Sequence, residues 1–355
     1  MTSLREVALL RLAAQWVAGP PAATPAEVVR RLGAVQGQDF PGAVTSIALR
    51  TADRCRKDVE VALDDGEIVR SWPMRGTLHV LAADDLHWML ELLGPRAMAG
   101  LAGRRERLEL TESDAERARE IVTAALDGGR RLRRADLLTV INDGGVATTG
   151  QRGYHLLWFL AQTGTLCLGP TDGGGEQLFV LLDDWVRAPR RLAGEEALGE
   201  LTRRFFLGHG PATAQDLARW AGITLRDARA GLAVARPELA VLDVDGAEHL
   251  MDPVTPDRLA ACREEAGGLF LLPGFDEFVL GYGDRRAIID PEFAGRIVPG
   301  NNGMFRSTVV HGGRIVGTWQ WTGRGATRRV TATALTTFPA DVEAAVSRAA
   351  AALPA

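Results

Sequence analysis

Lysine and cysteine are scarce in this sequence, and each scarcity excludes a class of chemistry. Of the 41 lysine and arginine residues only Lys57 is a lysine, so a Schiff-base reaction has one side-chain amine and the N-terminus to draw on. The three cysteines, Cys55, Cys167 and Cys262, lie far apart and form no CxxC pair. This excludes a zinc ribbon and argues against a disulfide framework, so we expect a cytoplasmic protein.

Long apolar runs and a secretory leader are also missing. No run approaches the roughly 18 apolar residues that a membrane-spanning helix needs. The first twenty residues carry Arg5 and Arg11 inside their apolar stretch, and no small-residue cleavage site follows a clean hydrophobic region. The sequence therefore predicts neither an integral membrane protein nor a secreted one.

Several catalytic motifs do not occur. The sequence has no HExxH, no GxxxxGK[ST] and no GxSxG, which excludes zinc hydrolases, P-loop ATPases and α/β-hydrolases. The six histidines are isolated and lack metal-ligand spacing. We expect no metal and no cofactor.

The chain has the composition of a globular protein, with 46% hydrophobic and 24% charged residues. A length of 355 residues exceeds what one core supports, so several domains are expected. The net charge of −4 opposes general binding to polyanions. However, residues 281–330 hold eight arginines against three acidic residues, a local balance of +5 that makes this segment the candidate nucleic-acid patch.

The clearest structural repeat lies between residues 210 and 252. Thr213 precedes a helix, AQDLARWAG, which Gly222 ends, and Thr224 caps a second helix, LRDARAGLAVA. Two strands, AVLDV and AEHLM, are joined by Asp245-Gly246, a strong hairpin signal. Two helices followed by a hairpin are the winged-helix pattern.

Two earlier segments show the same order of elements. The second copy, about 116–185, has helices at RRADLLTVIND and GQRGYHLLWFLAQTG and strands at TLCLG and EQLFVLL. The first copy is less regular, with three helices, AEVVRRLGAVQG, PGAVTSIALR and DVEVALDDG, before a hairpin of IVRSWPM and GTLHVLA.

From residue 268 the pattern turns to β-structure: LFLLPGFDEFVLGY, STVVHGGRIVGTWQW and RRVTATALTTF, with a final helix at ADVEAAVSRAAAAL. We therefore expect an α+β fold of three tandem winged-helix domains and a β-rich C-terminal section. The expected boundaries are 1–95, 96–190, 191–265 and 266–355.

The segment AVQGQDF at 34–40 indicates a function. Gln36, Gly37 and Gln38 match the Gln-x-Gln motif of the AlkZ branch of the AlkZ/YcaQ family of winged-helix DNA glycosylases, although that family usually has an aliphatic middle residue. Two glutamines at a helix end are most often solvated surface. Three further segments resemble the same family in the same order: SWPMRGTLHVLAADDL, LLPGFDEFVLGYGDR and NNGMFRSTVVHGGRIVGTW.

The resemblance implies a C-shaped monomer that binds double-stranded DNA carrying an alkylated purine. Substrates of the AlkZ branch are lesions made by DNA-alkylating natural products, including azinomycin crosslinks and intercalating guanine adducts, and the enzymes confer self-resistance. An N7-alkylguanine is already cationic, so its release needs a positioned water and dipoles facing the developing sugar cation. Gln38 is assigned to the water and Gln36 to orienting the water or the deoxyribose, with the roles exchangeable. Asp39 is a possible supporting carboxylate.

Other residues are candidates for contact with the lesion or with DNA. On the first hairpin these are Trp72, Met74, Arg75, Thr77 and His79, where core packing is the competing interpretation for the two apolar side chains. In the C-terminal section they are Arg306, Arg314, Trp319, Trp321, Arg324, Arg328 and Arg329. Four residues of the 271–285 segment are expected to be structural: Phe275, Asp276, Glu277 and Tyr282.

The function expected is therefore that of a monofunctional DNA glycosylase that excises bulky N7-alkylguanine adducts or unhooks crosslinks. Two alternatives stay open. A winged-helix transcription regulator would bind an operator and would not depend on Gln36 or Gln38. A scaffold that sequesters drug-modified DNA would bind adducts without releasing a base.

Overall fold

A computed structural model describes residues 2–323 and 327–354. The chain forms two compact units, and each is built around its own core. The first comprises residues 1–59 and 198–355, and the second comprises residues 60–197. Two helices cross the boundaries between them, α4 (Arg56–Asp64) and α11 (Gly194–His209).

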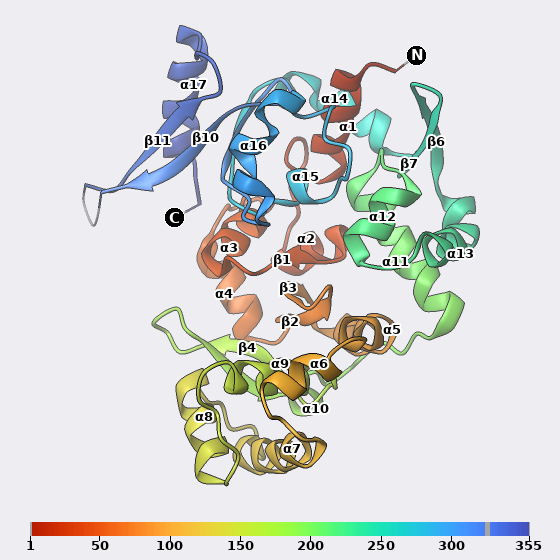
Figure 1. Ribbon diagram of the computed structural model, residues 1–355. Helices are drawn as coiled ribbons and strands as arrows, with labels where there is room; N and C mark the ends of the chain where they lie inside the picture. Colours follow the sequence, from red (N-terminus) through yellow and green to blue (C-terminus); the bar gives the residue numbers. More distant parts are fainter. Residues whose placement is uncertain (1, 324–326, 355) are drawn as a thin grey trace. The chain divides into compact units, whose positions relative to one another are not determined.

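The first unit contains the N-terminal helices and everything after α11 (Figure 1). Its first elements are α1 (Leu4–Ala14), α2 (Pro25–Leu32), β1 (Val35–Gln36) and α3 (Phe40–Ala48). It continues with α12 (Ala214–Ala221), α13 (Leu225–Ala235), β6 (Ala240–Val244), β7 (Ala247–Met251) and α14 (Thr255–Ala266). The remaining elements are β8 (Leu269–Leu272), α15 (Glu277–Leu280), α16 (Ala294–Ile297), β9 (Thr308–His311), β10 (Arg314–Thr322), β11 (Arg329–Ala334) and α17 (Ala340–Ala351).

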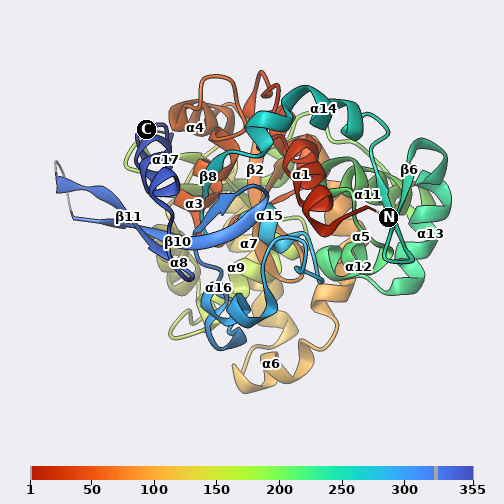
Figure 2. The same ribbon diagram turned by 90° about the horizontal axis from the view of Figure 1, so that it is seen from above.

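Helix α1 is the centre of this unit's main core. Eight of its residues, from Val7 to Ala14, are buried, and the helix packs along α14. A four-stranded antiparallel sheet has the order β11-β10-β9-β8. Trp319 packs in a small cluster with side chains of α17. In Figure 2 the β10–β11 hairpin extends beyond the rest of its unit.

The second unit has a sheet with strands in the order β3-β2-β4-β5. These strands are β2 (Ile68–Met74), β3 (Thr77–Ala82), β4 (Leu166–Thr171) and β5 (Gln177–Leu181). Its helices are α5 (Leu86–Met98), α6 (Ala102–Arg107), α7 (Glu112–Leu126), α8 (Arg134–Asp143), α9 (Arg152–Gln162) and α10 (Leu182–Trp185). Apolar faces of α7, α8 and α9 pack with these strands to form one core.

The helix-helix-hairpin order expected for residues 210–252 is confirmed element by element. Thr213 and Thr224 each close a capping box with an aspartate three residues later, and Gly222 ends α12 in the left-handed conformation at φ 70°. The elements of the second copy and the 68–82 hairpin are also confirmed. The division into three winged-helix domains and a C-terminal section stays a prediction.

Two elements differ from expectation. The helix expected over residues 26–37 ends at Leu32, because Gly33 has φ 75°, so Gln36 lies in strand β1 rather than at a helix end. The β-structure expected over LFLLPGFDEFVLGY is confined to Leu269–Leu272. Pro273 interrupts that strand, and Asp276 then caps the short helix α15 by accepting the Phe278 N–H.

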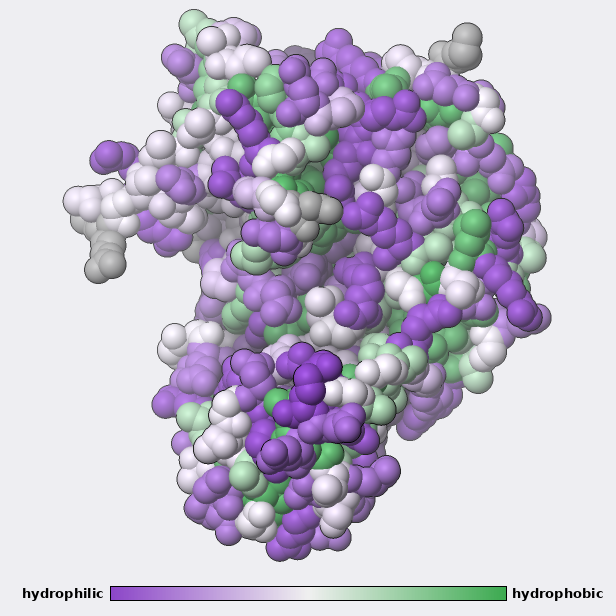
Figure 3. Space-filling view, viewed as in Figure 1, coloured by the Kyte–Doolittle hydropathy of each residue, from purple (hydrophilic) through white to green (hydrophobic). Residues whose placement is uncertain are grey.

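Within the described ranges no helix is both long and apolar enough to cross a bilayer. In the space-filling view of Figure 3, hydrophobic side chains form small patches separated by hydrophilic ones.

Candidate active site

The glutamine segment, Gln36–Gln38, joins two elements of the first unit. Strand β1 ends at Gln36, and Asp39 then caps helix α3 by accepting the Gly42 N–H at 3.3 Å. Gln36 is 7% exposed, whereas Gln38 and Asp39 are exposed. One glutamine is therefore held inside the fold while the other reaches the surface.

Gln36 fixes the backbone of the segment in two ways. Its own N–H donates to Glu277 Oε1 at 3.0 Å, and its side-chain Oε1 accepts the N–H of Gln38. The side-chain carbonyl of Gln36 is thus engaged with the chain itself. This arrangement positions Gln38.

Glu277 is the anchor of this arrangement, and it is 1% exposed. Its Oε2 accepts the indole N–H of Trp220 at 2.9 Å and lies 3.2 Å from Nε2 of His209. The His209 ring stacks on Phe205 with centroids 4.8 Å apart. A buried carboxylate needs such partners, because burial without them is costly.

The neighbouring carboxylate, Asp276, holds helix α3. Both of its oxygens accept from Arg50, each at 2.9 Å, and neither side chain of this ion pair is exposed. The Ser46 hydroxyl donates to the same carboxylate at 2.6 Å. Burial alone would raise the pKa of Asp276, but Arg50, Ser46 and the Phe278 N–H stabilise the carboxylate and hold that pKa below its usual value.

Sequence reasoning assigned Asp276 and Glu277 to structure, but it did not connect them with the glutamines. A signal was present, because two adjacent acids inside an apolar stretch must find partners when the stretch is buried. What the sequence could not supply was the identity of those partners. Arg50 is 226 residues from Asp276, and Gln36 is 241 residues from Glu277.

A loop of the C-terminal section packs close to the same region. A Cβ on Gly42 would lie 3.3 Å from the carbonyl oxygen of Gly274, and a Cβ on Gly274 would lie 2.7 Å from that of Phe305. Only glycines fit these approaches without a shift. Arg306, which follows Phe305, is exposed. Of the predicted C-terminal DNA contacts, Arg306 is therefore tied most directly to the glutamine segment.

The predicted residues of the first hairpin belong to the second unit. Trp72 is 3% exposed and Met74 is fully buried. The Trp72 ring meets Tyr154 edge-on with centroids 6.4 Å apart, within the core of the unit. Both side chains therefore pack in the core, which is the competing interpretation given for them above.

Arg75, Thr77 and His79 form one polar group at the tip of that hairpin. Arg75 has φ 55° and is exposed, and its Nη2 lies 3.0 Å from Nε2 of the buried His79. Nδ1 of His79 lies 2.8 Å from the Thr77 carbonyl oxygen. A carbonyl only accepts and a guanidinium only donates, so His79 is the neutral tautomer with its proton on Nδ1. Burial, together with the Arg75 charge, lowers the pKa of His79 to about 3.

The β10–β11 hairpin presents the C-terminal candidates. Trp319 is 7% exposed and donates its indole N–H to the Leu272 carbonyl at 2.8 Å, so it is a core residue. Trp321 is 41% exposed, and the Arg328 guanidinium lies 4.1 Å from its ring centroid. Arg329 is exposed, and Arg314 donates to the Arg286 carbonyl at 3.2 Å. Arg324 lies outside the described residues.

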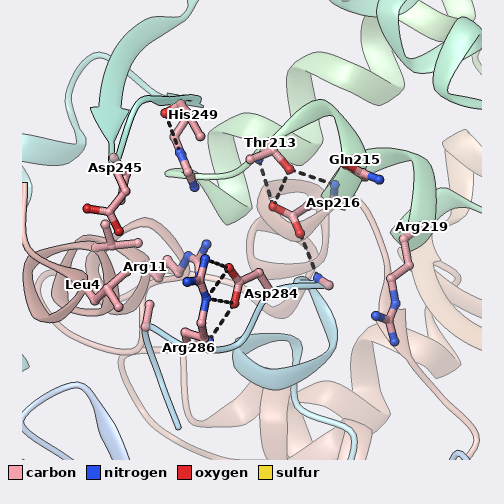
Figure 4. A pocket seen from close by; sticks show the side chains of 15 residues that line it. Leu4, Arg11, Thr213, Gln215, Asp216, Arg219, Asp245, His249, Asp284 and Arg286 are labelled. Atoms are coloured by element: carbon pink, nitrogen blue, oxygen red, sulfur yellow. Dashed lines mark hydrogen bonds and ion pairs between the residues drawn. The ribbon is translucent and has the colours of Figure 1, made fainter. Parts of the chain in front are cut away.

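A cavity of about 620 Å³ opens between α1, α12 and the loop after α15 (Figure 4). Both signs of charge line it. Asp284 pairs with Arg286 at 2.6 Å, and Asp216 accepts from the Gly283 N–H at 2.8 Å and from Thr213. Arg219 extends away from this group.

Comparison with known proteins assigns the chain to a family. The model of the AlkZ-like DNA glycosylase family matches residues 29–355. The chain belongs to this family. It is therefore a DNA glycosylase, an enzyme that hydrolyses N-glycosidic bonds, and the resemblance read from the sequence is confirmed.

A curated relative from Streptomyces sahachiroi, an interstrand DNA cross-link repair glycosylase, is 28% identical over 332 residues, which cover 90% of this chain and 88% of the relative. The solved structure of Streptomyces sahachiroi DNA glycosylase AlkZ superposes with a TM-score of 0.79 at 25% identity, covering 99% of this chain and 98% of that one. The mixed α/β fold is thus that of AlkZ.

Proposed function

We propose that this glycosylase excises N7-alkylguanine adducts, including crosslinks, from double-stranded DNA, with Gln36 and Gln38 at the reaction centre. The observation that carries the proposal is the glutamine segment itself, a buried Gln36 anchored on Glu277 beside an exposed Gln38. The relative that repairs interstrand crosslinks supports the substrate class.

The chemistry fits carboxamides better than strong acids. An N7-alkylguanine carries positive charge, so it leaves without a proton from the enzyme while the C1′–N9 bond breaks and the sugar becomes an oxocarbenium ion. Water then adds to C1′ and loses a proton. The protein has to place that water and present negative dipole ends to the sugar, and a side-chain amide oxygen does both.

The geometry supports a division of labour between the glutamines. Gln38 is exposed and holds the water, whereas Gln36 is a positioning residue whose Oε1 fixes the Gln38 backbone. Asp39 is a second candidate for polarising the water, since it is exposed and adjacent, but its Oδ1 also caps α3. Asp39→Asn keeps a cap acceptor and removes the charge, so it separates these two roles.

Residues of each unit are also proposed to contact DNA. Arg75, with His79 and Thr77 behind it, would reach the lesion or the backbone from the first hairpin. Trp321 offers an aromatic face to a base or to a drug moiety, with Arg328 and Arg329 beside it for phosphates. Arg306 is proposed as a phosphate contact next to the glutamine segment. The tandem winged-helix domains, the C-shape and the monomeric state belong to the same proposal.

One experiment tests this function against its two alternatives. Wild-type protein is incubated under single-turnover conditions with duplexes carrying an N7-methylguanine, a bulky N7 adduct or an N7–N7 crosslink, and alkali-labile sites are measured. We expect base release from at least one duplex. We also expect no strand nicking without alkali, because nicking by a Schiff-base lyase reaction needs an amine and the chain has one lysine. Binding without release from every duplex would contradict the proposal and favour a regulator or a sequestering scaffold.

A further inference from the structure

Helix α6 of the second unit has six residues, and three of them are arginines: Arg104, Arg105 and Arg107. The first and the last are exposed, whereas Arg105 is partly buried. In Figure 2 the helix projects at the edge of its unit, and in Figure 3 hydrophilic side chains gather over it. Within the part of the chain that the structure describes, none of the three arginines forms an ion pair. Other exposed arginines of the unit, such as Arg117 and Arg191, each pair with a glutamate.

The one acidic residue of this helix, Glu106, lies on a different side from the exposed arginines. Successive residues of an α-helix are about 100° apart, so Arg104 and Arg107 are separated by only about 60° around the axis. Glu106 is about 100° from Arg107 and about 160° from Arg104, and neighbours in a helical sequence do not face each other. Among the described residues no ion pair joins Glu106 to an arginine. The two exposed guanidinium groups therefore leave one side of α6 as cations that no carboxylate neutralises.

The inner side of α6 is fixed to helix α9. Leu108 packs on the core of the unit, and the Arg105 guanidinium lies 4.2 Å from the ring centroid of Phe159. Arg152, the first residue of α9, donates from Nη1 to the carbonyl oxygens of Leu108 and Glu109, at 2.5 Å and 2.8 Å. These bonds satisfy carbonyls at the C-terminal end of α6 and place a cation there. A helix held in this way is already ordered before a ligand binds, so binding costs less entropy.

The same face of α9 also holds the tip of the first hairpin. Trp158 donates its indole N–H to the Gly76 carbonyl at 3.2 Å, and its ring stacks on His155 with centroids 5.9 Å apart. His155 is three residues from Trp158 and four from Phe159, so these three side chains share one helix face. Gly76 follows Arg75, the hairpin residue proposed above to contact DNA. One face of α9 thus connects that hairpin with α6 inside a single unit.

We propose that Arg104 and Arg107 bind backbone phosphates of duplex DNA, so that α6 extends the contact surface that begins at Arg75. DNA is the substrate of the family to which the chain belongs, and guanidinium forks match phosphate oxygens. The inference rests on the proposed function for the Arg75 contact and not for the roles of the glutamines. Phosphate contacts carry no sequence or lesion information, so undamaged duplex uses the same surface.

The test measures the salt dependence of binding to an undamaged duplex by fluorescence anisotropy. Each neutralised phosphate contributes about 0.9 to the slope of log K against log salt. We expect Arg104→Ala/Arg107→Ala to lower the slope by about one if the arginines share a phosphate and by about two if each holds its own. The matched control, Arg117→Ala/Arg191→Ala, removes two exposed charges from the same unit and should keep the wild-type slope. An unchanged slope in the α6 variant, or an equal loss in the control, would overturn the proposal.

A lysine variant separates the effect of charge from an effect on folding. Arg104→Lys/Arg107→Lys retains both charges, so we expect the wild-type slope. If the lysine variant lost as much slope as the alanine variant, the loss would come from a disturbed α6 and the proposal would fail. Failure of the proposed function is a separate outcome. A protein that releases no base could still depend on α6 for its slope, and an active glycosylase could bind DNA without any contribution from α6.

Discussion

The carboxylate of Glu277 accepts the backbone N–H of Gln36 at 3.0 Å, across 241 residues of sequence. This bond, together with the Gln36 side chain on the Gln38 N–H, makes the glutamine segment a rigid part of the first unit. Catalysis by a neutral amide depends on such placement, because the amide adds little acid or base strength of its own.

Glu277→Gln should therefore impair catalysis more than its modest chemical change suggests. The substitution turns one acceptor oxygen into a donor that faces the N–H groups of Gln36, Trp220 or His209, and it should lower the free energy of unfolding by about 1–3 kcal/mol. We expect single-turnover base release to fall by about 100-fold, since displacements near 1 Å have such effects. Glu264→Gln, at an exposed position of α14, is the matched control. A fully active Glu277→Gln would contradict the positioning role.

The Arg50–Asp276 ion pair predicts a large effect on stability. Asp276→Ala leaves a fully buried guanidinium without its carboxylate, so the free energy of unfolding should drop by about 3–5 kcal/mol. Asp53→Ala, at an exposed position, should change it little. Urea unfolding at pH 7 measures both, and equal small effects would show that Arg50 finds another partner.

The same pair has a defined pH dependence. The pKa of Asp276 is lower in the folded state than the value near 3.9 of an unfolded chain. Its stabilisation is therefore present above about pH 3.9 and is lost as the pH falls through the lower folded value. The difference in unfolding free energy between wild type and Asp276→Asn, measured between pH 7 and 3, should be constant at neutral pH and begin to shrink as the pH falls below about 3.9. A constant difference over that range would contradict the lowered pKa.

His79 should destabilise the protein at mildly acidic pH. Its pKa is about 3 in the folded state and about 6.5 in an unfolded chain, so the unfolded state takes up the proton first. Stability is retained above pH 6.5 and falls below it, by about 2 kcal/mol at pH 5. His79→Gln, which keeps an acceptor for Arg75, should lack this loss. Urea unfolding of both proteins at pH 8 and pH 5 measures this loss. An equal change in the free energy of unfolding in the two proteins would contradict the lowered pKa of His79.

Trp321 is expected to contribute to DNA binding through its exposed face. Trp321→Ala should weaken binding of adducted duplex by about 1–3 kcal/mol, the value of one stacked base. Trp319→Phe serves as a comparison, because Trp319 is buried and its indole N–H is bound to Leu272. Fluorescence anisotropy measures both affinities. If only the Trp319 variant weakened binding, the exposed face of Trp321 would not be the contact.

Local signals predicted local structure well in this chain. The caps at Thr213 and Thr224, the stop at Gly222 and the hairpin turn at Asp245 depend on neighbouring residues, and the structure confirms them. The glutamine segment was found by its motif. Its placement was misjudged, because the left-handed Gly33 ends the helix before Gln36.

Contacts between residues far apart in the chain could not be predicted from the sequence. Asp276 and Glu277 were expected to be structural, but only the fold brings Arg50 and Gln36 to them. Such pairs depend on packing between elements, which residue patterns do not specify.

The most direct test of the account is the single-turnover rate of N7-alkylguanine release by Gln38→Ala. Gln38 is exposed, so the variant should fold and melt like wild type. The account predicts a rate about 100- to 1,000-fold lower, in line with removal of one preorganised group from a reaction centre, with binding of the adducted duplex retained. A wild-type rate in a correctly folded Gln38→Ala would contradict the assignment of the water to Gln38.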